Sequence, residues 1–175
     1  MKKVLLCCLL LIGSRYTYAQ QIPPNELYQI LRFWRMDSPN FVTQTYEYIQ
    51  TIDRAWQLRL EPQKENGGLM ILLGYGKDKV WYKDEQHRLL LSFEPNASAS
   101  KGLIYTFTDL ESWKLYNQRL QSMEPRLVKT TKLDGGTQTQ YRVSDIYISM
   151  DEFPPGMSGV ERQYRITLMG VNRSQ

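Results

Sequence analysis

The stretch FTDLESWKLYNQRLQSM, residues 107–123, is the clearest helix in the sequence. Thr108 and Glu111 have the spacing of a capping box, in which each side chain bonds the backbone amide of the other residue. Four apolar residues then recur at helical period: Trp113, Tyr116, Leu120 and Met123. We therefore predict an amphipathic helix that buries one face, which we expect to pack on a sheet.

Two further helices are predicted upstream of this stretch. The first is a short helix of about three turns, because apolar residues recur at i, i+3, i+4 and i+7: Leu27, Ile30, Leu31 and Trp34. The second follows Ser38 and Pro39, which have the order of a cap and a first-turn proline. Its predicted buried stripe consists of Val42, Tyr46, Ile49 and Ile52.

The remaining periodic segments alternate in polarity or are short apolar runs, which is typical of strands. Before the opening helix, strands are predicted at residues 56–60, 69–75, 79–83 and 88–93, with a short strand at 103–107 leading into the helix. After the helix, strands are predicted at residues 126–131, 137–143, 145–150 and 163–169. Each half of the chain thus contains helical segments followed by strands.

The two halves have matching landmarks. Gly67 and Gly135 begin glycine pairs 68 residues apart, and the predicted caps Ser38 and Thr108 lie 70 residues apart. A period near 70 residues indicates a duplicated domain. We predict an α+β fold of two tandem units, at residues 20–93 and 103–175 with a linker at 94–102. In each unit a helix precedes a four-stranded antiparallel sheet, and the helices pack on one sheet face. A single undivided α+β domain is the alternative.

This layout resembles that of the beta-lactamase inhibitory proteins, and the resemblance covers most of residues 25–169. The chain departs from that family because it lacks the cysteines that staple the units, and it shows no inhibitory-loop motif. The resemblance implies a tandem fold and a binding role. In size and layout the sequence is also similar to uncharacterised exported bacterial proteins.

Residues 1–19 have the pattern of a signal peptide. Lys2 and Lys3 precede an apolar run at residues 4–12, and Ala19 ends the segment with a small residue at the cleavage position. The run is far shorter than the roughly 20 residues that span a bilayer. We expect cleavage after Ala19, export to the periplasm, cell surface or medium, and no membrane span in the mature chain.

Removal of the signal changes the chemistry that is available. Cys7 and Cys8 both lie within it, so the mature chain would lack disulfides, thiolate zinc sites and a cysteine nucleophile. Lys2, Lys3 and Arg15 would also be lost, leaving 19 basic against 18 acidic residues. This balance gives no electrostatic argument for nucleic acid as a partner.

Few residues suggest catalysis, and we predict no cofactor and no metal site. His87 is the only histidine, and it follows Asp84 and Glu85 in a predicted hairpin turn where solvated polar residues are expected. Asp151 and Glu152 form a second acidic pair, also in a predicted loop. Paired carboxylates can act as acid and base in glycoside cleavage, but nothing in the sequence places one of them in an apolar pocket.

Alternation in the strands predicts which side chains face away from the helices: Arg59, Trp81, Arg142, Tyr147 and Arg165. Trp81 is assigned outward because Lys79 and Lys83 share its parity and lysines are seldom buried. Arginine, tryptophan and tyrosine often dominate protein interfaces. The alternative is a solvated sheet face on which arginine stems lie over aromatic rings.

These observations favour an exported, non-catalytic binding module of the bacterial cell envelope with a protein or glycan partner. An envelope-polymer hydrolase that uses Asp84, Glu85 and His87 is an alternative from another class. A structural envelope factor without a ligand is a third.

Overall fold

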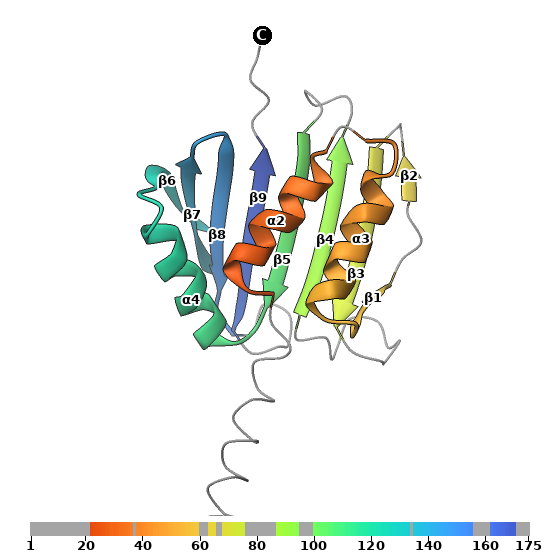
Figure 1. The fold of residues 1–175 in the computed structure, drawn as a ribbon. Helices are drawn as coiled ribbons and strands as arrows, with labels where there is room; N and C mark the ends of the chain where they lie inside the picture. Colours follow the sequence, from red (N-terminus) through yellow and green to blue (C-terminus); the bar gives the residue numbers. More distant parts are fainter. Residues whose placement is uncertain are drawn as a thin grey trace, which may run out of the picture.

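The computed structural model describes residues 22–36, 38–59, 63–65, 68–75, 87–94, 100–133, 135–155 and 162–170. These residues form three helices and one sheet of nine strands, so the predicted α+β class is confirmed (Figure 1). The helices are α2 (Pro24–Trp34), α3 (Phe41–Ile52) and α4 (Leu110–Gln121), and all three lie on the same face of the sheet. Each helix in the described part of the chain is too short or too polar to cross a lipid bilayer.

The strands are β1 (Trp56–Leu58), β2 (Gln63–Glu65), β3 (Gly68–Tyr75), β4 (His87–Glu94), β5 (Ser100–Phe107), β6 (Arg126–Leu133), β7 (Gly136–Val143), β8 (Ile146–Phe153) and β9 (Gln163–Gly170). Every pair is antiparallel. The order across the sheet is β1-β3-β4-β5-β9-β8-β7-β6, and β2 also pairs with β3. The first half of the chain therefore meets the second where β5 pairs with β9.

The core lies between this sheet and the helices. Five buried side chains form one row in register across neighbouring strands: Leu73, Leu89, Tyr105, Ile166 and Met150. Side chains alternate between the faces of a strand, so this row fixes which parity faces the helices. The opposite parity lies on the helix-free face.

Helix α2 is the central cover of the core. Its predicted apolar stripe is confirmed, because Leu27, Ile30, Leu31 and Trp34 are all buried. The Trp34 indole Nε1 donates a hydrogen bond of 2.8 Å to the Ser92 carbonyl on β4. The tryptophan thus buries its ring without losing a partner for its polar atom.

Helix α3 buries most of its predicted stripe, because Ile49 is buried and Val42 and Ile52 pack against the core. Thr45 and Ile49 are buried, whereas Tyr46 is exposed. The helix packs against α2 as well as the sheet, and the rings of Phe33 and Tyr48 lie 4.6 Å apart. Thr45 fits this close contact because its hydroxyl donates to the Phe41 carbonyl at 2.6 Å.

Helix α4 confirms the predicted stripe but begins one residue later than predicted. Tyr116 and Leu120 are buried, and Trp113 and Met123 pack against the core. Asp109 has extended backbone dihedrals, and its carboxylate accepts a 2.7 Å hydrogen bond from the Ser112 amide. The cap is therefore Asp109 and not Thr108, because only a residue directly before the first helical turn can reach that amide.

Strands β5 and β8 extend furthest beyond their predicted bounds. Strand β5 pairs with β4 as far back as residue 100, inside the segment 94–102 that we predicted as a linker; residues 95–99 lie outside the described residues. Strand β8 continues to Phe153, so Asp151 and Glu152 belong to a strand and the loop prediction was wrong. Each of these two strands pairs with a neighbour on both sides. The predicted strand at 79–83 lies outside the described residues.

Candidate functional site

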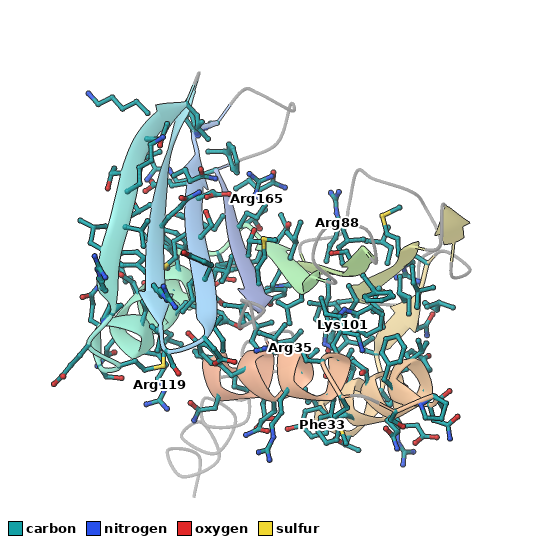
Figure 2. The ribbon with its side chains drawn as sticks, turned by 90° about the horizontal axis from the view of Figure 1, so that it is seen from above. Phe33, Arg35, Arg88, Lys101, Arg119 and Arg165 are labelled. Carbon is teal, nitrogen blue, oxygen red and sulfur yellow. The ribbon has the colours of Figure 1, made fainter. Side chains whose placement is uncertain are left out.

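The sheet face away from the helices is the candidate functional surface, and we call it the open face. Figure 2 shows Arg88 and Arg165 on this side and Phe33 and Arg35 on the helix side. Strand register places the open-face side chains in rows that cross the whole sheet. Neighbouring side chains within a row come close enough to act as one surface.

An apolar group occupies the open face of β3, β4 and β5. Leu72, Leu90 and Ile104 are cross-strand neighbours in one row, and all three are only partly buried. Met70 and Met169, in the next row, are exposed. Leaving this much aliphatic surface in water is unfavourable, so the group is a candidate contact area.

Arg165 on β9 is held in a fixed position on the open face. Its Nε and Nη2 atoms both lie 2.7 Å from Asp151 Oδ2, and the Asp151 carboxylate is only 1% exposed. Ser149 donates to the other carboxylate oxygen at 2.7 Å, and the guanidinium carbon lies 4.8 Å from the centre of the Phe153 ring. The guanidinium is therefore oriented before any partner arrives, which lowers the entropic cost of contacting one.

Tyr147 and Arg142 form a second polar and aromatic group on β8 and β7. They are opposite each other in the strand register, and the Arg142 guanidinium carbon lies 5.7 Å from the centre of the Tyr147 ring. Tyr147 is 41% exposed. On β6, the edge strand next to β7, Arg126 lies opposite Arg142 in the strand register. This end of the open face is therefore strongly basic.

The structure brings together three of the five residues predicted to face outward. Arg142, Tyr147 and Arg165 lie on adjacent strands of the open face. Arg59 follows β1 at the other end of the sheet, where its guanidinium lies 3.5 Å from Gln57 Oε1. Trp81 lies outside the described residues.

Sequence analysis missed the apolar row and the acid that holds Arg165. Strands β3 and β4 contain apolar residues of both parities, so the pattern did not show that Leu72 and Leu90 face away from the helices. Asp151 was assigned to a loop. The sequence contains one indication of its position. Asp151 lies four residues after Tyr147, so the two side chains face the same side of the sheet if β8 continues as far as Asp151.

His87 is buried, contrary to the solvated turn residue that we predicted. It is 3% exposed, and its Nδ1 lies 2.6 Å from the Tyr105 hydroxyl. Its Nε2 lies 3.9 Å from Asp109 Oδ2. As the first residue of β4 it pairs with Phe107, which places the ring inside the core. Burial lowers the pKa of His87, and the nearby Asp109 partly opposes this shift.

The hydrolase alternative requires His87 to meet Asp84 and Glu85 at a solvent-accessible site. Both acids lie outside the described residues. The His87 ring is stacked on Tyr105 and Phe107 and does not reach the surface. In the part of the chain that the structure describes, no three histidine, cysteine, aspartate or glutamate side chains are grouped to hold a metal ion.

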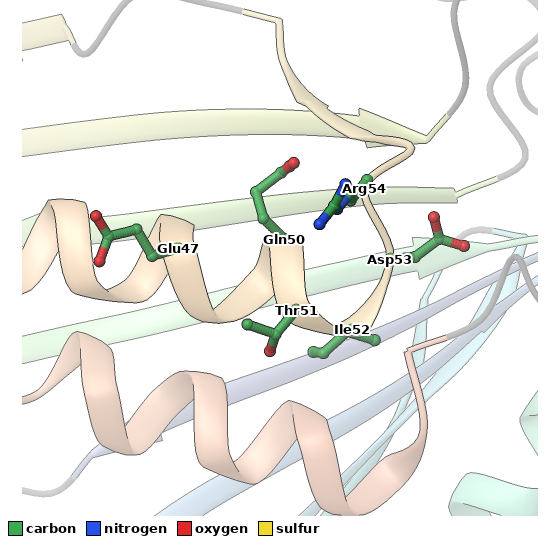
Figure 3. Close-up of a pocket in the computed structure, with 6 residues that line it drawn as sticks. All are labelled: Glu47, Gln50, Thr51, Ile52, Asp53 and Arg54. Atoms are coloured by element: carbon green, nitrogen blue, oxygen red, sulfur yellow. The ribbon is translucent and has the colours of Figure 1, made fainter.

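Two surface hollows that are lined by described residues do not assemble catalytic groups either. Figure 3 shows one at the end of α3, with Glu47 and Asp53 at its opposite ends. The Asp53 carboxylate is already used, because it accepts hydrogen bonds from the Tyr75 hydroxyl at 2.7 Å and from the Ala55 amide at 2.8 Å. A second hollow lies beside α2, where Arg35 forms a 3.1 Å ion pair with Asp145.

Comparison of the chain with protein-family models, with curated proteins and with solved structures found no match. The functional interpretation therefore depends on the chemistry of the open face. That face combines uncovered aliphatic side chains, an exposed tyrosine and oriented arginines, which together can bury area and form directional bonds.

Proposed function

We propose that this chain is an exported, non-catalytic binding module whose open face binds a partner protein or glycan. The observation that carries the proposal is a sheet face that no described helix covers, on which Leu72, Leu90 and Ile104 form a partly exposed row. One face of a sheet is normally buried against a second layer. The helices supply that layer on one face, so a partner would add a further layer by covering the partly exposed apolar side chains of the open face.

The dimensions of the open face fit a standard interface. Strands β3 to β9 each have eight residues, and seven strands about 27 Å long and about 4.8 Å wide give an area of about 900 Å². A typical stable complex buries about 800 Å² on each partner. The open face is thus large enough for one partner without help from the helices.

The side chains favour a protein over a glycan. Methionine and arginine are enriched at protein interfaces, and flexible methionines adapt to uneven apolar surfaces. Met70 and Met169 flank the apolar row, and Arg165 is oriented beside it. Sugar rings stack on aromatic faces, and the centre of the open face is aliphatic.

The binding test uses two matched double variants. Tyr147→Ala with Met169→Ala removes exposed open-face side chains, and Leu110→Ala with Leu115→Ala removes exposed side chains from α4. We expect the first pair to weaken capture of a cross-linked envelope partner about 30-fold or more, the effect of a lost hot spot. The α4 pair should leave capture unchanged. Equal capture by both variants would show that the open face is not the binding surface.

Trp81 provides a further prediction. If it faces outward, Trp81→Ala should weaken partner binding by about 2 kcal/mol while costing less stability than the roughly 3 to 5 kcal/mol of a core tryptophan truncation. Chemical denaturation of the variant measures the second quantity. A core-sized loss of stability would place Trp81 inside and remove it from the binding surface.

Export is supported by the pattern of residues 1–19. The expected product of a native-type host begins at Gln20, and intact mass measurement of the purified protein tests this. Recovery of a chain that retains Met1 would contradict export by this signal.

We also infer that the chain consists of two duplicated units, as in the layout of the beta-lactamase inhibitory proteins. The strand order supports this. The strands of the first half follow one another from one sheet edge to β5, those of the second half follow one another from the opposite edge to β9, and β5 pairs with β9. The outermost hairpins of the two halves also correspond, because each closes with a residue paired to the glycine three positions later. Glu65 pairs with Gly68 between β2 and β3, and Leu133 pairs with Gly136 between β6 and β7. This strand order assigns β5 to the first unit, whereas the predicted boundaries placed it in the second. The test is an experimental structure in which residues 41–107 are superposed on residues 110–170. Unrelated paths of the two halves would reject duplication.

A further inference from the structure

Strand β6 forms one edge of the sheet, and among the described strands it pairs only with β7. It is exposed on both faces along its length, with only Thr131 partly buried. Leu127 and Val128 are 59% and 48% exposed. The outer backbone edge of such a strand offers amide and carbonyl groups to another strand.

The charge of β6 is entirely of one sign. Its three charged residues are basic, namely Arg126, Lys129 and Lys132, and the strand contains no acid. The adjacent β7 adds Arg142 opposite Arg126 and contains no acid either. An approaching strand would therefore meet a positive edge.

This charge argues against a second copy of the chain as the occupant. Antiparallel pairing of two β6 strands would gather six basic side chains with no acid between them, and like charges on neighbouring strands destabilise pairing. A register shift between Leu127 and Lys129 also bends the edge. Lysines and bulges are the features that prevent edges from pairing with themselves, yet the same lysines attract an acidic strand.

We propose that the β6 edge binds an extended acidic segment of a partner protein, which adds a further strand to the sheet. Main-chain hydrogen bonds would supply affinity, and alternate side chains would supply specificity. Arg126 and Lys129 lie on the open-face side of β6, whereas Leu127 and Lys132 lie on the helix side. The edge thus fits a segment that presents acids on the open-face side, with an apolar residue beside Leu127 on the helix side.

The proposal is independent of partner binding by the centre of the open face. The two surfaces share no tested residue, so each can fail alone. If both hold, the added strand would extend the open face beyond β6.

The probe is a fluorescent eight-residue peptide of alternating valine and glutamate, titrated against the purified chain and followed by anisotropy. We expect binding that weakens as salt rises from about 0.05 M to about 0.5 M, since exposed charges are screened. Arg126→Glu with Lys129→Glu should weaken it about tenfold or more and should allow a valine–lysine peptide to bind instead. The matched control, Lys114→Glu with Arg119→Glu on α4, should bind the acidic peptide as the unchanged chain does.

Amide hydrogen exchange identifies the binding mode. The acidic peptide should slow exchange within residues 126–133 and leave residues 68–75, near the other edge, unaffected. Unchanged exchange in β6, or equal peptide binding by the charge-reversed edge variant, would overturn the proposal. Concentration-dependent dimers that disappear in that variant would overturn it in favour of a second copy.

Discussion

At the scale of single residues, two polar groups that were expected in water, His87 and Asp151, are buried by the fold. His87 lies between aromatic rings and Asp151 lies beneath Arg165, each with a hydrogen-bonding partner within 2.7 Å. Both are paired because an unpaired buried polar group costs more than the bond itself contributes. Their surroundings lead to two predictions.

The first prediction concerns acid stability. The pKa of His87 is lower in the folded chain than in the unfolded chain, because burial disfavours the charged ring. Below about pH 6.5 the unfolded chain therefore takes up a proton that the folded chain does not, and this part of the stability is lost as pH falls. His87→Gln should flatten the stability profile between about pH 7 and pH 5. Urea denaturation across that range tests this, and an unchanged slope would contradict it.

The second prediction compares the two partners of the open-face ion pair. Arg165→Ala leaves a buried carboxylate without its guanidinium and should cost about 2 kcal/mol or more. Asp151→Ala leaves a guanidinium that can turn into water, because Arg165 is 37% exposed, and should cost about 1 kcal/mol. Denaturation of both variants ranks them. The reverse order would mean that Asp151 is not the desolvated partner.

At the scale of elements, α4 shows how a helix and its cap are specified separately. Its buried face follows from apolar spacing alone, so the sequence predicted it. The cap depends on which of two adjacent polar residues adopts extended backbone dihedrals, and here β5 ends at Phe107 and leaves Asp109 in that position. The capping-box spacing of Thr108 and Glu111 led to the prediction of Thr108, and aspartate is also a residue type favoured at caps.

Substitution of the two candidates distinguishes them. Asp109→Ala should lower the free energy of unfolding by about 1 kcal/mol through loss of the hydrogen bond to the Ser112 amide, whereas Thr108→Ala should change it little. Measurement at about pH 8, where histidine is neutral, separates this effect from the influence of Asp109 on His87. Equal losses from both variants would argue against Asp109 as the cap.

At the scale of the whole molecule, the start of the described chain is tied to the centre of the core. Ile22 is fully buried, its amide donates to the Tyr105 hydroxyl at 3.5 Å, and its carbonyl accepts from the Tyr116 hydroxyl. Burial raises the pKa of both tyrosines, so they stay neutral donors and acceptors. One short segment therefore links β5 and α4.

This link predicts the effect of a truncation. A chain that begins at Pro24 loses the buried Ile22 side chain, which contributes roughly 1.5 to 3 kcal/mol, and also loses the carbonyl that accepts from the buried Tyr116 hydroxyl. We expect a lower thermal midpoint than for a chain that begins at Gln20. Identical midpoints in calorimetry would show that the segment contributes nothing to the fold.

The sequence by itself determined the helices and the parity of the outward residues on β7, β8 and β9. Helical and alternating periods depend only on neighbours in the chain, so Tyr116 and Leu120, or Tyr147 and Arg165, could be assigned to their faces without a structure. Only the tertiary structure decided that β5 pairs with β9, that His87 enters the core and that Leu72, Leu90 and Ile104 form a row. Those outcomes depend on contacts between residues far apart in the chain, and no local period records which strand lies next to which.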